Sequence, residues 1–449
     1  MEPSPPRRIL FVAYHFPPTG GGGVQRNAKF ARYLGEFGYE PVVITGSGAA
    51  TGRWTPTDET LAGDVPGTLE VHRVEGPEPA GSTGWRARAE RLLMRRRPLH
   101  AWWIDGAVEL GKRFGRDCEL IYVSLEPYEA SEIGMRLSQA LGKPWVADLQ
   151  DPWALDEMRV LPSRLHRRID LARMRRALSS ADAVVMNTAE AVRRVQRELP
   201  GLGQAMVVSI PNGFDAADFS APDPARRDGR FRIVHAGYLH TDLGRRHRRT
   251  RRLRRLLGGD HYDVDILTRS HVFLIEALQQ LQSSDPDLAS RIELWLAGVL
   301  SDVDREVAQG WPSVELPGYL SHAETIELIR SADLLFLPMQ NLPPGTRAGL
   351  VPGKTYEYLA SGRPILAPVP EGDARDLLEA SGTAWTCDPD DVGEMTRLVR
   401  LLVGGSGTSA PDRPAGAEVL ARYERRLLTR DLAGVFDRLG SARRSAREG

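Results

Sequence analysis

Short, unbroken runs of apolar residues alternate along this chain with segments whose apolar positions recur every three or four residues. A run such as Ile9–Ala13 is typical of a strand buried on both faces of a parallel sheet, whereas Val24–Leu34 has the spacing of an amphipathic helix. The other predicted strands are Val42–Thr45, Leu69–Val74, Leu120–Ser124, Trp145–Leu149, Ala183–Asn187, Met206–Ile210, Phe231–Gly237, Ile292–Gly298, Leu334–Pro338 and Pro364–Pro368.

Strands that alternate with helices predict an α/β fold with a doubly wound parallel sheet. Because the pattern starts again at Phe231, we expect two Rossmann-like domains with a cleft between them. The boundary falls in the segment Asn212–Arg230, which is rich in Pro, Asp and Gly, so the domains are predicted at 1–215 and 216–404. A linker, Gly404–Gly416, then precedes a final amphipathic helix within residues 405–449.

Composition excludes some classes of function but does not identify one. The formal net charge is zero, which removes any whole-molecule argument for nucleic acid, and all but four of the 59 basic residues are arginines. The two cysteines, Cys118 and Cys387, lie far apart and outside any Cys-x-x-Cys, which predicts a reducing compartment and no metal site. No stretch approaches the ~18 apolar residues of a membrane span. We therefore expect a cytoplasmic protein.

The segment Tyr14–Arg26, YHFPPTGGGGVQR, joins the first strand to the first helix. Its glycines allow a ligand to approach the backbone, and the helix start offers free N–H groups. The dinucleotide fingerprint G-x-G-x-x-G fails, because the third glycine position is Gln25 or Arg26. A nicotinamide or flavin site is therefore disfavoured. The alternatives that stay open are a phosphate-facing loop and a flexible turn.

The segment Gly349–Leu366, GLVPGKTYEYLASGRPIL, resembles a phosphate-binding P-loop, but Ala348 stands where the first glycine should be. It follows the strand Leu334–Pro338, and we expect a helix that begins near Gly353. Lys354 would then lie in the first turn, where an ammonium is disfavoured by ~0.3–1 kcal/mol unless an anion binds nearby.

A diphosphate would reverse that penalty, and Glu357, one turn deeper, is placed to accept the hydroxyls of a ribose. The alternative is a surface ion pair between Lys354 and Glu357, worth a few tenths of a kcal/mol.

Five segments, in this order, resemble the retaining nucleotide-sugar glycosyltransferases of the GT-B fold, in particular the bacterial family four. They span nearly the whole chain: Tyr14–Arg26, Pro144–Trp153, Ile210–Asp215, Val314–Pro338 and Pro352–Pro368. Gly349 stands where the family usually carries the first of two glutamates. This places the chain with the subgroup that has a Pro-x-Lys segment there instead.

The resemblance implies an N-terminal acceptor-binding domain, a C-terminal donor-binding domain, and a last helix that returns to the first domain. It also implies roles for single residues. Gly22 and Gly23 would face the donor phosphates, Lys354 and Arg269 would bind the diphosphate, Glu357 the ribose, and Tyr319 and Leu320 would border the base.

A histidine that many family members place beside the cleft is missing, because the strand Leu120–Ser124 is followed by LEPYEAS. Asp148 and Asp151 are our candidates for polar contact with the reacting sugar, and Ser124 and Glu129 are weaker ones. For Asp151 the alternative is a helix cap or an Asp-Pro turn.

Two arginine-rich segments remain. Gly244–Ser270 is an insertion that contains Arg269 and is either a solvated helix or a contact for nucleic acid or an anionic membrane. Arg86–Trp103 mixes arginine with Leu, Met and Trp, as an amphipathic segment on a lipid surface would, which suits a lipid-linked acceptor.

Taken together, the sequence predicts a glycosyltransferase with catalytic residues Lys354 and Asp151, which moves a sugar from a nucleotide-diphosphate donor to a hydroxyl acceptor. We expect retention of configuration, no metal or other cofactor, no nucleic-acid partner, and a role in cell-envelope polysaccharide or glycoconjugate synthesis. The acceptor would be a glycan, a lipid-linked sugar or a small molecule. The alternatives are an epimerase or phosphorylase on the same fold and a non-catalytic sugar-nucleotide-binding protein.

Overall fold

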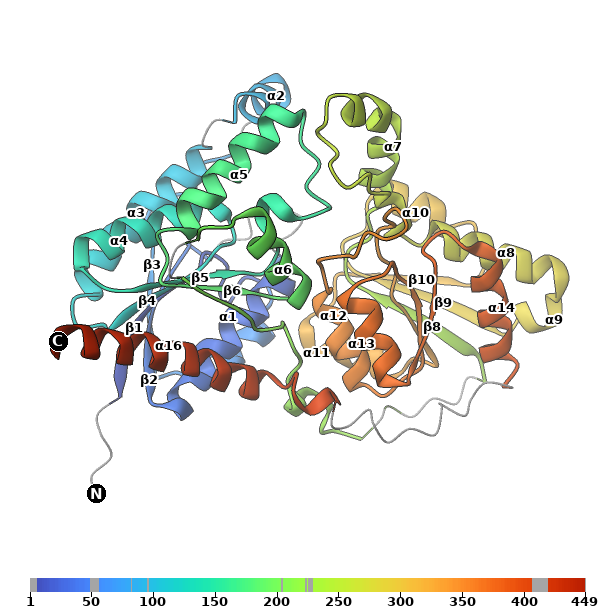
Figure 1. Cartoon of the computed structure of the whole chain (residues 1–449). Helices are drawn as coiled ribbons and strands as arrows, with labels where there is room; N and C mark the ends of the chain where they lie inside the picture. Colours follow the sequence, from blue (N-terminus) through green and yellow to red (C-terminus); the bar gives the residue numbers. More distant parts are fainter. Residues whose placement is uncertain are drawn as a thin grey trace. The chain divides into compact units, whose positions relative to one another are not determined.

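A computed structural model describes residues 6–48, 56–81, 83–94, 97–202, 205–222, 224, 229–405 and 419–448 of the chain (Figure 1). It divides into two compact units. The first unit holds residues 1–156, 164–212 and 425–449, and the second holds 157–163 and 213–424. The sequence-based boundary at 215/216 lies close to this division. The second linker, Gly404–Gly416, falls almost wholly outside the described residues.

The first unit is built on a seven-stranded parallel sheet in the order β3-β2-β1-β4-β5-β6-β7. Side chains of β1 alternate between two cores, with Phe11 in one and Leu10 in the other, which is why the strand is apolar throughout. The strands are β1 Arg7–Val12, β2 Tyr39–Thr45, β3 Glu70–Arg73, β4 Leu120–Ser124, β5 Trp145–Leu149, β6 Ala183–Met186 and β7 Met206–Ser209.

Helices cover both faces of this sheet. The core that contains Phe11 also contains Phe30 of α1 and Phe436 of α16, whereas α3, α4 and α6 pack on the other face (Figure 1). The last helix therefore packs within the first unit. The helices are α1 Gly22–Tyr33, α2 Gly84–Leu92, α3 Pro98–Phe114, α4 Ser131–Leu141, α5 Arg164–Leu178, α6 Ala189–Glu198 and α16 Arg425–Glu448.

The second unit repeats the plan with a six-stranded parallel sheet in the order β10-β9-β8-β11-β12-β13. One face packs on α11, α12 and α13, and the other on α8 and α14 (Figure 1). Its strands are β8 Phe231–Ala236, β9 Ile292–Ala297, β10 Val314–Gly318, β11 Leu334–Phe336, β12 Ile365–Pro368 and β13 Ala384–Cys387. Its helices are α7 Thr241–Leu256, α8 Val272–Ser284, α9 Pro286–Ala289, α10 Asp302–Ala308, α11 His322–Arg330, α12 Gly353–Ala360, α13 Asp373–Ser381 and α14 Val392–Val403.

The predicted fold class, two doubly wound parallel-sheet units, is confirmed. Two strands were not predicted, β10 and β13, which are the two edges of the second sheet. Both are largely half-buried, so neither has the fully apolar run that a central strand shows. Within the described residues, no helix is both long and apolar enough to cross a bilayer.

Candidate active site

The second unit has a topological switch point between β8 and β11. The chain leaves β8 toward β9 and β10 on one side, then returns to β11 and continues toward β13 on the other. Ligands of open α/β sheets bind beyond the carboxyl ends of the strands at such a point. The helix that carries Lys354, α12, follows β11, so the fold brings this lysine to the expected edge.

Helix α12 begins at Gly353, directly after Pro352, and no side chain caps its first turn. Tyr358 anchors the helix to the sheet, because its hydroxyl accepts a 2.8 Å hydrogen bond from the backbone N–H of Ala236 at the end of β8. The predicted helix is thus confirmed, and its uncapped N–H groups lie beside the switch point.

The amine of Lys354 contacts a histidine that the sequence did not single out. The Lys354 Nζ lies 3.2 Å from Nε2 of His235, a residue of β8 that is buried. The other ring nitrogen, Nδ1, lies 3.0 Å from the carbonyl oxygen of Phe336 in β11. A carbonyl only accepts, so Nδ1 carries the proton and Nε2 presents its lone pair to the amine.

The pKa of Lys354 is lowered to about 7, mainly by burial and also by the nearby charge of Arg269, whereas the charge of Glu357 opposes the shift. Burial, together with the charge of Lys354, also lowers the pKa of His235 well below its usual value. Two cations that repel each other beside a helix start are stabilised by an anion between them. The arrangement therefore fits a phosphate group.

A hydrogen-bonded chain holds Arg269. Its guanidinium lies 3.4 Å from the amide oxygen of Gln340, and the amide nitrogen of Gln340 donates a 3.0 Å hydrogen bond to Glu157. Glu157 also accepts a 3.1 Å hydrogen bond from the backbone N–H of Gly349. The short segment 157–163 thus belongs to the second unit and supports its site, which sequence position alone did not indicate.

The residues of the second unit that were also predicted to bind the donor follow strands of the same sheet or lie on its helices. Glu357 is only 7% exposed, so a solvated Lys354–Glu357 surface pair is not the arrangement that the structure has. Tyr319 and Leu320 directly follow β10, two strands away from β8. Tyr319 is partly exposed there.

The first unit has its own switch point, between β1 and β4. The glycine loop follows β1, and α1 begins at Gly22. No atom lies within 4 Å of a side chain added at Gly22, whereas one added at Gly23 would come within 2.7 Å of the Glu126 carboxylate. Gln150 donates a 2.9 Å hydrogen bond to the carbonyl oxygen of Gly23.

Glu126, which follows β4, is a candidate that the sequence analysis missed. It lies beside the start of α1, and burial raises the pKa of its carboxyl group. The signal was present in LEPYEAS, the segment that replaces the expected histidine, but nothing in the sequence chose Glu126 over Glu129. The structure separates them, because Glu129 lies near the surface and pairs with His100.

Asp148 is a buried partner of Arg26, which makes a structural role the one that its contacts support. It is fully buried, and Arg26 donates to both of its carboxylate oxygens, at 2.8 and 2.9 Å, while the hydroxyl of Tyr122 donates to one of them. The strand pattern could not show this, because Arg26 is 122 positions away in sequence. Ser124 is also buried.

Asp151 follows β5 and is half-buried. Its carbonyl oxygen accepts a 2.9 Å hydrogen bond from the N–H of Trp153, so the backbone turns at this Asp-Pro step. The turn accounts for the backbone of Asp151 but assigns no role to its carboxylate.

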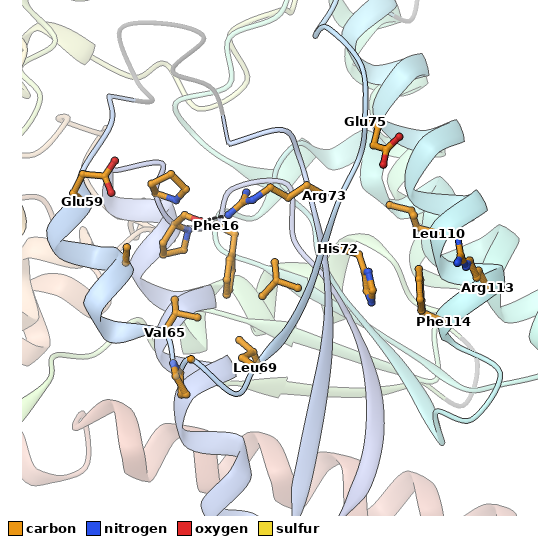
Figure 2. A pocket seen from close by; sticks show the side chains of 16 residues that line it. Phe16, Glu59, Val65, Leu69, His72, Arg73, Glu75, Leu110, Arg113 and Phe114 are labelled. Atoms are coloured by element: carbon orange, nitrogen blue, oxygen red, sulfur yellow. Dashed lines mark hydrogen bonds between the residues drawn. The ribbon is translucent and has the colours of Figure 1, made fainter.

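The first unit also contains a cavity of about 730 Å³ beside the edge strand β3 (Figure 2). His72 stacks on Phe114 in its wall, with ring centroids 3.5 Å apart, and Arg73 donates a 2.5 Å hydrogen bond to the carbonyl oxygen of Pro17. None of the predicted site residues lines this cavity.

Two family models match the chain. The model described as a glycosyl transferase 4-like domain matches residues 21–213, and the model described as glycosyl transferases group 1 matches residues 267–404. Between them they cover most of the chain, and the gap contains β8 and the arginine-rich helix α7. A search of curated protein sequences finds no match.

Solved structures show the same fold at low sequence identity. A sucrose-phosphate synthase from Thermosynechococcus elongatus is 13% identical with a TM-score of 0.64, and the alignment covers 97% of this chain and 100% of that one. HepE of Anabaena, in complex with UDP and glucose, is 17% identical with a TM-score of 0.58 and coverages of 96% and 99%. An α,α-trehalose 6-phosphate synthase from Burkholderia multivorans is 14% identical with a TM-score of 0.60 and coverages of 98% and 100%.

The fold places this chain among the two-domain proteins of the GT-B architecture. The matched domains make it more specific: the chain is a glycosyltransferase, similar to those of group 1 and family four.

Proposed function

We propose that the second unit binds a nucleotide-diphosphate sugar through Lys354, Arg269 and the start of α12. The observation that carries this proposal is the pair of mutually repelling cations at the switch point, which a diphosphate would neutralise. The solved complex of HepE with UDP and glucose, on the same fold, supports it. Glu357 would accept hydrogen bonds from the ribose hydroxyls, and Tyr319 and Leu320 would border the base.

In the reaction that we propose, the bond between the sugar anomeric carbon and the diphosphate oxygen breaks. A bond to the acceptor hydroxyl oxygen forms, and the proton of that hydroxyl passes to the departing diphosphate oxygen. Lys354 and Arg269 stabilise the charge on the leaving diphosphate, which lets protein cations take the place of a metal ion. In the first unit, Gly22, Gly23 and Asp151 are proposed contacts for the phosphates and the transferred sugar. Retention of configuration is part of the proposal.

The proposed donor is tested by thermal shift. Ligands that bind only the folded protein raise its melting temperature with concentration, so a panel of nucleoside diphosphates and nucleotide sugars should show a shift for one base and one sugar. The selected donor is then incubated with candidate acceptors in the presence of EDTA, and proton NMR reports the anomeric configuration of the product. We expect turnover that EDTA does not lower and a product of unchanged configuration.

Two outcomes would favour the alternatives. Consumption of the donor with no acceptor present would indicate an epimerase. Tight donor binding without turnover on any glycan, lipid-linked or small hydroxyl acceptor would indicate a binding protein. A role in cell-envelope polysaccharide synthesis is the biological setting that we propose. The two cysteines, both free and buried, support a cytoplasmic location.

We further propose that the protein binds peripherally to the surface of an anionic membrane. Large exposed apolar side chains gather on the arginine-rich helices of each unit. In the first unit, Trp85 of α2 is 74% exposed, and Leu92 and Leu93 lie at the end of that helix. Leu165 lies in the first turn of α5. Arginine with exposed leucine favours lipid over nucleic acid, because apolar side chains gain nothing from phosphate alone.

In the second unit, α7 carries the same combination. Leu253 and Leu256, the latter 84% exposed, share one face with Arg249 and Arg252 at spacings of three and four residues. The opposite face, with Gly244 and His247, is buried.

The double variant Leu253→Asp/Leu256→Asp is expected to lower binding to vesicles that contain anionic lipid by about 10²-fold or more, because each buried leucine contributes roughly 1.5–3 kcal/mol. Co-sedimentation with neutral and anionic vesicles measures it. The matched control is Arg397→Ala/Arg400→Ala, the same change in charge on the exposed side of α14. Unchanged sedimentation of the leucine variant, or preferential binding of RNA, would contradict the proposal.

A further inference from the structure

His235 is held in one orientation and one tautomer by the sheet itself. It is 1% exposed, and its Nδ1 donates to the carbonyl oxygen of Phe336 on the neighbouring strand at 3.0 Å. The ring is neutral because burial lowers its pKa. Its Nε2 lone pair therefore points in a fixed direction, and the Lys354 amine lies 3.2 Å away along it.

Gly237 makes room for that amine. A side chain added at this position would come within 2.7 Å of Nζ and 3.2 Å of Cε of Lys354. The lysine side chain thus passes directly over the backbone of Gly237, whose φ of 109° also favours glycine. His235 and Gly237 confine the amine from two directions.

Other charged and titratable groups surround the amine. Arg269 contributes a positive charge and Glu357 on α12 a negative one. His271 is neutral, since burial lowers its pKa to about 4, and burial also keeps the hydroxyl of Tyr358 protonated by raising its pKa. The amine has a pKa of about 7. Among the described groups at this site whose pKa is shifted, it is therefore the one that titrates near neutral pH.

We propose that His235 is a positioning residue, whose Nε2 holds the Lys354 amine over Gly237 in the free protein, and that this amine takes up a proton from solvent when a diphosphate binds. The inference rests on the proposed function, because it assumes that Lys354 receives the diphosphate. It adds that the site is assembled before the ligand arrives. A prepositioned amine spares the ordering cost that a mobile lysine would bear on binding.

Isothermal titration calorimetry with UDP and GDP tests this, in Tris and in HEPES, between about pH 6.5 and 9. Bound diphosphate raises the pKa of the amine. The affinity for the diphosphate is therefore highest below the pKa that the amine has in the free protein, and it falls as pH rises above that value. We expect the wild-type affinity to fall by up to about tenfold per pH unit above the free pKa, with proton uptake approaching one per ligand near about pH 8. The difference in heat between the two buffers measures that uptake.

Two substitutions separate positioning from support of the fold. His235→Asn keeps a donor for the Phe336 carbonyl but has no atom at the position of Nε2. His235→Gln places an acceptor there. We expect His235→Asn to bind the diphosphate about tenfold more weakly at about pH 6.5, and to take up almost no proton at about pH 8, because the released amine is already protonated. His235→Gln should restore both the affinity and the uptake.

Each outcome has one meaning. Proton uptake and a pH profile in His235→Asn equal to those of the wild type would overturn the inference. If the wild type binds neither diphosphate, or if Lys354→Met binds it equally well, the proposed donor site fails instead. Should His235→Asn not fold, Gly237→Ala tests the same positioning of the amine, because its added carbon displaces the amine while His235 stays. Proton uptake should again be lost. Wild-type uptake in a folded Gly237→Ala would overturn the inference.

Discussion

Replacing Lys354 by methionine is expected to abolish most of the turnover and, at the same time, to raise the melting temperature. The loss of turnover, about 10²–10³-fold in kcat/KM, follows because the amine is one of the cations that would stabilise the leaving diphosphate. The gain in stability follows from the same burial, because the free protein must keep an ammonium in a poorly solvated place beside Arg269.

The direction of the pKa shift of Lys354 determines how the effect of Lys354→Met on stability depends on pH. Burial lowers the pKa of Lys354 to about 7, so below that pH the folded protein carries the full penalty of a buried charge. The penalty is relieved as pH rises from about 7 toward 10.5, the ordinary value for a lysine in the unfolded chain. Lys354→Met should therefore stabilise the protein by about 1–3 kcal/mol near pH 6 and by almost nothing near pH 10.

Melting temperatures measured across this pH range test the expected gain in stability. Values of kcat/KM for the selected donor test the expected loss of turnover. The matched control is Lys112→Met, the same change at an exposed position of α3, for which neither stability nor turnover should move. A variant that loses turnover together with stability would show that the lysine supports the fold, and unchanged turnover would remove Lys354 from the active site.

Asp148→Asn is expected to destabilise the first unit by about 3 kcal/mol or more. The substitution keeps the size of the side chain but leaves the guanidinium of Arg26 buried without its countercharge, which is the costly way to break a buried pair. The exposed pair between Asp105 and Arg136 is the control, and Asp105→Asn should change stability by no more than about 0.5 kcal/mol.

Urea denaturation followed by tryptophan fluorescence measures this, since Trp103, Trp145 and Trp153 are all buried in the first unit. The same variant distinguishes the two roles considered for Asp148. If its stability were unchanged and turnover were lost, the carboxylate would act on the sugar, as its place in the sequence first indicated. Lost stability is the result that the contacts with Arg26 and Tyr122 predict.

Part of the candidate site could be predicted from the sequence, and part could not. Pro352, Gly353 and the position of the preceding strand were enough to place Lys354 in the first turn of a helix at the carboxyl edge of the sheet. His235 could not be found in this way, because it lies inside an apolar strand 119 residues earlier and has no local signal. Glu126 and Glu129 are three positions apart in sequence, and only the packing around each decides which one lies beside the glycine loop.

What the sequence by itself determined is the alternation of strands and helices in two halves, the glycine loop, and a lysine at an uncapped helix start. These depend on spacing between near neighbours, which the chain carries as a local pattern. What only the tertiary structure decided is the chemistry of those groups. The neutral tautomer of His235, the lowered pKa of Lys354 and the burial of Asp148 against Arg26 all depend on contacts between residues that are far apart in the sequence. Electrostatic effects depend on distance in space and on burial, and neither is determined before the sheets assemble.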